Sequence, residues 1–222
     1  VKAGQLLSTR ADLLPRSYVE ALEKLQESGP PVPAETIRAI LEEELGASPL
    51  ALFAVFDETP LASASIAQVH RATLKDGTEV AVKVQRPGIR ENIETDIEIA
   101  TRLAKLLEER SPVGRDYNLL GTVAALGEML RGELDFTREY RNADRLRVNL
   151  SSMPHVVIPH CHWDLTTARV LTEDYIGGIR VAAIEELEDR GYPRRELAYK
   201  VAQCVLRQIY VELQQLLFFI ST

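Results

Sequence analysis

Residues 60–88 read PLASASIAQVHRATLKDGTEVAVKVQRPG, and this stretch decides the fold. Its polar and apolar residues alternate with a period of two over 66–74 and again over 78–85, which predicts two strands. Between them lies Lys75-Asp76-Gly77, and an Asp-Gly pair supplies the positive φ angles that a tight hairpin turn needs. The stretch therefore predicts an antiparallel hairpin, in which the side chain of Lys83 faces away from the valines on either side of it.

Helical periodicity flanks the hairpin on both sides. A capping-box pattern at Ser17 and Glu20 predicts an early amphipathic helix. Further helices are predicted over 33–45, 89–107, 119–149 (continuous or broken), 184–190 and 196–218. Short strands are predicted over 156–158 and 168–174. The predicted order is helices, then about five short strands with a helix among them, then helices. This order indicates an α+β fold, because a parallel α/β fold would alternate strand and helix throughout.

Composition excludes several classes of protein. The 222 residues carry a net charge of −7 and are 45% hydrophobic, which is typical of a globular chain and argues against a general nucleic-acid binder. No apolar run reaches the roughly 18–20 residues that cross a bilayer. The two cysteines, Cys161 and Cys204, predict free thiols in a reducing compartment.

Two features of the hairpin region point to phosphate binding. The small residues Ala62, Ser63, Ala64 and Ser65 let backbone N–H groups approach an anion, and Lys83 can reach a phosphate as a point charge. Each has a plainer interpretation, as a surface turn and as part of a solvated strand face. Together they resemble the arrangement of protein kinases, in which a small-residue loop covers ATP above a strand lysine.

An acidic cluster follows in the predicted central helix. Asp135 and Glu139 are four residues apart and would share a helix face, with Glu133 close by. Lys83 is a candidate cation for this cluster, although Arg138 and Arg141 could instead balance it locally.

The histidines do not predict a metal site. On a strand, His160 and His162 would lie on the face opposite to that of Cys161, and no second pair of ligands has suitable spacing. His70 is predicted to be a packed or hydrogen-bonded strand residue.

Together these segments resemble the UbiB family of atypical, kinase-like proteins, also called aarF-domain-containing kinases. The resemblance rests on five segments across the chain. They are Lys2-Ala3-Gly4-Gln5 as the KxGQ motif, 60–70 as the alanine-rich loop, 80–88 as the lysine strand, Glu133-Leu134-Asp135-Phe136 with Glu139 as the ExD segment, and 171–177 as the hinge.

The resemblance implies a protein-kinase-like fold and a role for each motif. Residues 1–56 would form a helical extension, 57–178 the N-lobe ending in the hinge, and 179–222 the start of a truncated helical C-lobe. Lys83 would contact the α/β-phosphates of ATP, with Glu139, or less favourably Glu133, as its ion-pair partner. The backbone of the loop would cover the phosphates, and that of the hinge would take the adenine. The implied nucleotide-binding residues are Ala62, Ser63, Ala64, Ser65, Lys83, Glu139, Glu173, Asp174, Tyr175 and Ile176. The implied regulatory lid comprises Lys2, Gly4, Gln5, Glu133 and Asp135.

The resemblance also implies the chemistry and its setting. The cofactors would be ATP and Mg²⁺, with the metal ligands and the catalytic loop beyond this chain, so the chain alone should be inactive and no catalytic residue is named in it. The parent protein would be a kinase or ATPase that supports isoprenoid-quinone (ubiquinone) biosynthesis. It would be cytoplasmic and peripherally membrane-associated, or organellar in a eukaryote, and would contact lipid and quinone-biosynthesis proteins. The alternative is a non-catalytic pseudokinase or a lipid- or partner-binding scaffold.

Overall fold

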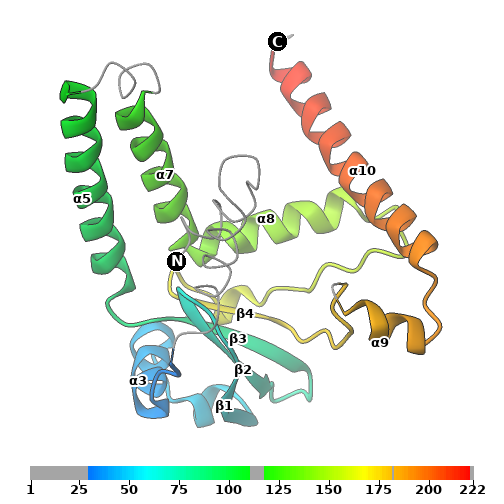
Figure 1. Cartoon of the computed structure of the whole chain (residues 1–222). Coiled ribbons are helices and arrows are strands. Elements are labelled where there is room, and N and C mark those ends of the chain that lie inside the picture. The colour runs from blue at the N-terminus through cyan, green and yellow to red at the C-terminus, as the bar shows by residue number, and fades with distance from the viewer. Residues whose placement is uncertain (1–29, 111–117, 182, 221–222) are drawn as a thin grey trace.

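A four-stranded antiparallel sheet lies at the centre of the computed structural model, which describes residues 30–110, 118–181 and 183–220 (Figure 1). The strands are β1 (Val55–Ser63), β2 (Ala67–Thr73), β3 (Glu79–Gln85) and β4 (Val170–Asp174), paired in the order β1-β2-β3-β4. The predicted hairpin is therefore confirmed as β2–β3, and β4 joins the outer side of β3.

Helices surround the sheet. They are α3 (Ala34–Leu45), α4 (Pro49–Leu52), α5 (Ile89–Arg110), α7 (Leu119–Glu133), α8 (Phe136–Asn149), α9 (Ile184–Asp189) and α10 (Arg194–Ile220), with a short 3₁₀ helix at Trp163–Leu165. Helices α5 and α7 pack side by side and rise away from the sheet, whereas α8 runs across it (Figure 1). This mixture of helices and an antiparallel sheet is the predicted α+β, kinase-like fold. Within the described residues no helix is both long and apolar enough to span a bilayer.

The two faces of the sheet bury different cores. Val80, Val82 and Val84 are fully buried on the face that α3 covers, where Ile37 and Leu41 pack against them. The opposite face carries Ala67 and Leu171, which pack with Leu134 and Phe136 from the α7–α8 region. The alternation of the β3 residues between these cores places Lys83 on the α8 side.

Several predicted boundaries differ from the structure. Residues 156–158 form no strand, and the nearest pairing with β4 is a single bridge between Cys161 and Glu173. β1 begins at Val55, inside the range assigned to the helical extension. The predicted helix over 119–149 is two helices that meet at Leu134 and Asp135, because Asp135 caps α8 by accepting a hydrogen bond from the Thr137 N–H at 3.0 Å. The interruption does not fall at any of the glycines in this segment.

Replacing Gly77, in the turn of the β2–β3 hairpin, should lower the stability of the fold. The φ of Gly77 is +90°, which a side chain strains. We expect Gly77→Ala to lower the free energy of unfolding by about 1 kcal/mol or more, measured by urea denaturation. Gly178→Ala is the control, because no atom lies within 4 Å of its added Cβ and its φ is not positive. Equal midpoints for the two variants would contradict the expectation.

Candidate functional site

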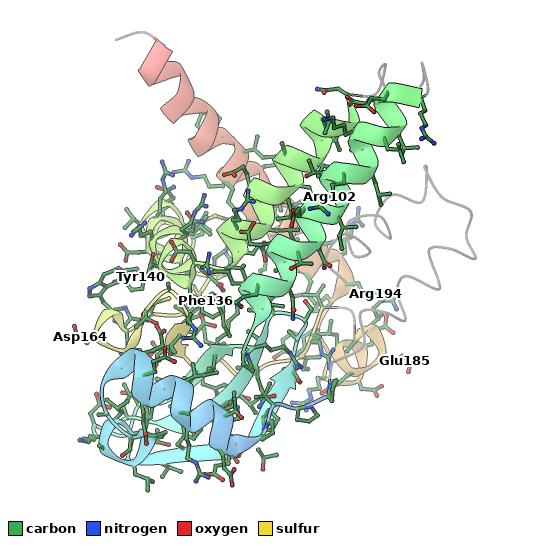
Figure 2. The ribbon with its side chains drawn as sticks, turned by 90° about the vertical axis from the view of Figure 1, so that its left-hand side faces the viewer. Arg102, Phe136, Tyr140, Asp164, Glu185 and Arg194 are labelled. Carbon is green, nitrogen blue, oxygen red and sulfur yellow. The ribbon has the colours of Figure 1, made fainter. Side chains whose placement is uncertain are left out.

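The ion pair between Lys83 and Glu139 is the centre of the candidate site. The Lys83 Nζ donates to both carboxylate oxygens of Glu139, at 2.9 and 2.7 Å, across 56 positions of sequence. The same ammonium lies 4.7 Å from the ring centroid of Phe136, the first residue of α8. Phe136 is fully buried between α8 and the sheet (Figure 2). The ammonium is therefore fixed by a carboxylate and by an aromatic face.

The sheet register relates Lys83 to the small-residue turn. Ala62 pairs with Val69, and Val69 pairs with Lys83, so the three residues form one row across the sheet. Two strand spacings of about 4.8 Å separate the ends of that row. Ala62 and Ser63 are the last residues of β1, so the small-residue segment runs from this row into the turn that joins β1 to β2.

Gln85 positions the α7–α8 junction, a role that its place in an alternating strand does not predict. Its Nε2 donates to the Leu134 carbonyl at 2.8 Å and to the Ala168 carbonyl at 2.9 Å, and its side chain is 2% exposed. The plainer interpretation of the Lys83 face of β3 as a solvated strand face is therefore wrong at Gln85, which lies on the same face and inside the protein. By holding the junction, Gln85 fixes the start of α8, which carries Glu139.

Arg86 and Gln68 hold the small-residue turn through hydrogen bonds. The Arg86 guanidinium donates to the Ala64 carbonyl at 2.8 Å and to the Ser63 hydroxyl at 2.6 Å. The Ser63 hydroxyl in turn donates to the Gln68 Oε1 at 3.4 Å. The Ser63 side chain thus binds within the protein, and a phosphate would meet the backbone of the turn rather than this hydroxyl.

An open polar pocket of about 430 Å³ adjoins the ion pair. Lys83, Glu139, Glu133 and Asp135 line it, together with Arg138. The structure therefore brings Glu133 and Asp135 to the same pocket as the ion pair, while Glu139 is the carboxylate that contacts the lysine. The prediction that Asp135 and Glu139 share a helix face is wrong, because Asp135 is the cap that precedes α8.

The hinge segment follows β4 directly. The Tyr175 N–H donates to the Glu79 carbonyl at 2.9 Å, and the Arg71 guanidinium lies 4.7 Å from the Tyr175 ring centroid. Glu173 is paired with Ala81 on the Lys83 side of the sheet, Asp174 accepts a hydrogen bond from the His162 Nε2 at 2.9 Å, and Ile176 is exposed. The hinge thus begins on the Lys83 face of the sheet, beside the ion pair.

Burial raises the pKa of Glu173, and the nearby charge of Glu139 raises it further, against an opposing effect of Lys83. The carboxylate form of Glu173 is thus less favourable in the folded chain than in the unfolded chain. We expect Glu173→Gln to raise the Tm by roughly 1–3 °C at pH 7. The gain should vanish as the pH falls below the ordinary carboxyl pKa, where Glu173 is protonated whether folded or unfolded. Differential scanning fluorimetry across pH measures this.

Glu185→Gln is the control for that prediction, since Glu185 lies on α9, away from the sheet (Figure 2). A gain that is equal for the two variants, or independent of pH, would contradict the assigned cause.

The segment 160–162 has a structural role. Burial raises the pKa of the Cys161 thiol to about 11, so it is protonated at neutral pH.

His70 is fully buried, accepts from the Gln68 Nε2 at 3.0 Å and donates from Nδ1 to the Asp57 carbonyl at 2.8 Å. Across the described part of the chain, no three His, Cys, Asp or Glu side chains are grouped to hold a metal ion. The predicted lid residues Lys2, Gly4 and Gln5 lie outside the described residues.

Comparison with family models identifies one match. The model described as "ABC1 atypical kinase-like domain" matches residues 24–214, most of the chain.

Relatives in several organisms carry kinase names. "Probable protein kinase UbiB" of Marinobacter nauticus is 43% identical over 210 residues, covering 95% of this chain and 38% of the relative. "Protein ACTIVITY OF BC1 COMPLEX KINASE 8, chloroplastic" of Arabidopsis thaliana is 37% identical over 211 residues, covering 94% of this chain and 28% of the relative. The chain therefore spans about a third of the length of these curated relatives.

One solved structure resembles the fold over most of the chain. It is the complex of Rv3197 with erythromycin from Mycobacterium tuberculosis, with a TM-score of 0.62 and 32% identity. The similarity covers 87% of this chain and 47% of that one.

Proposed function

The chain belongs to the ABC1 atypical kinase-like family, and we propose that it forms the ATP-binding lobe of an atypical kinase or ATPase. The observation that carries this proposal is the bidentate contact of Lys83 with Glu139 in the row that leads to the small-residue turn. A strand lysine paired with a helix carboxylate is how kinases hold a cation against the α/β-phosphates.

Each part of the proposed site has a distinct task. The Lys83 ammonium neutralises phosphate charge, and Glu139 keeps that ammonium in place. The backbone from Ala62 to Ser65 covers the phosphates. The hinge at 173–176 takes the adenine through backbone groups other than the Asp174 and Tyr175 N–H groups, which donate to the His160 and Glu79 carbonyls. Glu133 and Asp135, at the pocket beside Lys83, would face the regulatory segment that includes Lys2, Gly4 and Gln5.

Mg²⁺ would accompany the nucleotide and offset phosphate charge when bound. We propose, as the family resemblance implies, that its ligands and the phosphoryl-transfer residues lie outside this chain, so that the chain alone binds nucleotide without turning it over.

The UbiB names of relatives support a role in ubiquinone-type quinone biosynthesis for the whole protein. In that role it would act at a membrane and meet lipid and quinone-biosynthesis proteins, in the cytoplasm or, as the name of the chloroplastic relative suggests, in an organelle.

Thermal shift with three probes tests the nucleotide site. ATP should raise the Tm of the chain more than adenosine or inorganic tripolyphosphate does, because only ATP engages the hinge and Lys83 together. A Tm that does not respond to ATP, in this chain and in the full-length protein alike, would overturn the proposal.

A binding module for apolar molecules is a second candidate. A cavity of about 250 Å³ between α5 and α7 has mainly aliphatic walls, including Ile93, Ile97 and Leu126, and Ser65 of the small-residue turn also lines it. Stronger fluorescence of an environment-sensitive apolar dye with the wild type than with Ile97→Gln would support this function, and equal fluorescence would exclude it.

A further inference from the structure

A proline-rich segment leads into the described fold directly behind the small-residue turn. Residues 30–33 read Pro-Pro-Val-Pro and precede α3. Proline fixes φ near −65°, so consecutive prolines make a stiff, extended segment. Pro33 has φ −56° and ψ 140°, which is polyproline geometry, and Val32 is only 9% exposed. Displacement at one end of such a segment passes along it rather than being absorbed within it.

Gln68 binds this segment and the turn with one buried amide. Its Oε1 accepts from the Val32 N–H at 2.8 Å, and its Nε2 lies 3.3 Å from the Val32 carbonyl, to which it donates. The same Oε1 accepts from the Ser63 hydroxyl in the turn. Gln68 is fully buried, so water cannot replace these partners cheaply.

Arg86 makes a second connection between the same two segments. One Nη donates to the Pro30 carbonyl at 3.0 Å, while Nε and the other Nη donate to Ala64 and Ser63 in the turn. All three acceptors are neutral. The planar fork of the guanidinium, with donors on three nitrogens, therefore matters more here than its charge.

We propose that Gln68 and Arg86 couple the 30–33 segment to the small-residue turn, so that the two move as one unit and nucleotide affinity responds to the position of the chain that enters at Pro30. This inference rests on the proposed nucleotide site, because it assigns the turn as the element that responds. Gln68 and Arg86 are positioning residues in it, since they act through the turn.

The sequence provides a single-site reporter for this coupling. Within 30–33 only Val32 has a backbone N–H, and Gln68 accepts its hydrogen bond. We expect Mg²⁺–ATP to slow hydrogen exchange at the Val32 amide by at least about threefold in the wild-type chain, although the nucleotide would not touch that residue. Arg86→Ala should abolish this slowing while ATP still protects amides of the turn.

Two further variants separate geometry from charge and from general loss of an arginine. Arg86→Lys keeps the charge but not the three-point fork, so it should behave like Arg86→Ala. Arg102→Ala removes an exposed arginine of α5, remote from the turn, and should keep the wild-type response (Figure 2). If Arg86→Ala does not fold, as judged by circular dichroism, Ser63→Ala replaces it, because it removes the hydroxyl that joins Arg86 to Gln68.

The outcomes are distinguishable. An ATP-dependent Tm shift with no change in exchange at Val32 would overturn the coupling and leave the nucleotide site intact. Slowing at Val32 that persists in Arg86→Ala or Ser63→Ala would overturn the role of these side chains. No ATP-dependent Tm shift in the wild type would overturn both proposals.

Discussion

Lys83→Ala should weaken ATP binding by roughly ten- to a hundredfold, which corresponds to the loss of one or two charge-assisted hydrogen bonds to phosphate. The folded chain should survive the change. The Lys83 and Glu139 side chains are 26% and 46% exposed, and a pair so accessible to solvent contributes less than about 1 kcal/mol to stability. The ATP-dependent Tm shift should therefore be lost at concentrations near the wild-type Kd, while the Tm without ligand stays nearly unchanged.

Glu139→Gln tests the other half of the pair. It keeps the Lys83 charge but weakens the anchor that holds the ammonium, so its effect on ATP affinity should lie between those of the wild type and Lys83→Ala. Lys200→Ala is the matched control, because Lys200 pairs with Glu196 in the exposed part of α10. Undiminished ATP affinity in Lys83→Ala, or an equal loss in Lys200→Ala, would exclude Lys83 as a phosphate-binding group.

The hairpin and the Lys83–Glu139 contact could be predicted because their signals are local. Alternation in β3 specifies which face Lys83 occupies, and Asp76-Gly77 specifies the turn, so both follow from a few neighbouring residues. The ion-pair partner of Lys83, 56 positions away, was less certain, because the sequence offered three candidate carboxylates. The structure brings Glu139 to the lysine because the cap at Asp135 sets where α8 begins, and Glu139 then falls in its first turn.

The buried polar side chains could not be predicted because their partners are distant and mostly backbone. Gln85 alternates in register with Lys83, and nothing local distinguishes its buried position from an exposed one. Its acceptors lie 49 and 83 positions away, at two irregular points of the chain. The same holds for Gln68, whose partner Val32 lies 36 positions earlier. The local sequence around a glutamine in an alternating strand does not indicate that a backbone carbonyl from a distant segment will pack against it.

The missing strand at 156–158 has a related cause. Two valines and an isoleucine predict a strand by propensity, but a strand needs a continuous partner edge. Beside β4 this segment pairs only at the Cys161–Glu173 bridge, after which the chain forms a 3₁₀ turn at Trp163. Tertiary pairing thus overrides the local preference.

Gln85→Leu should destabilise the folded chain measurably. The substitution keeps the approximate volume but removes one donor from each of two carbonyls, leaving Leu134 with the Arg90 guanidinium at 3.2 Å and Ala168 with the Phe136 N–H at 3.0 Å. Each hydrogen bond lost costs about 0.5–1.5 kcal/mol, so we expect a loss of roughly 1–3 kcal/mol in the free energy of unfolding by urea denaturation. Because the junction that Gln85 holds also starts α8, residual folded protein should bind ATP more weakly as Glu139 loses its fixed position.

Gln208→Leu provides the comparison, since the Gln208 amide makes only a weak 3.6 Å contact with the Cys204 sulfur within α10. That variant should change stability by less than about 0.5 kcal/mol. If the two variants unfold at the same urea concentration, the carbonyls at the junction must find other donors. Gln85 would then not be what connects the strand of Lys83 to the helix of Glu139.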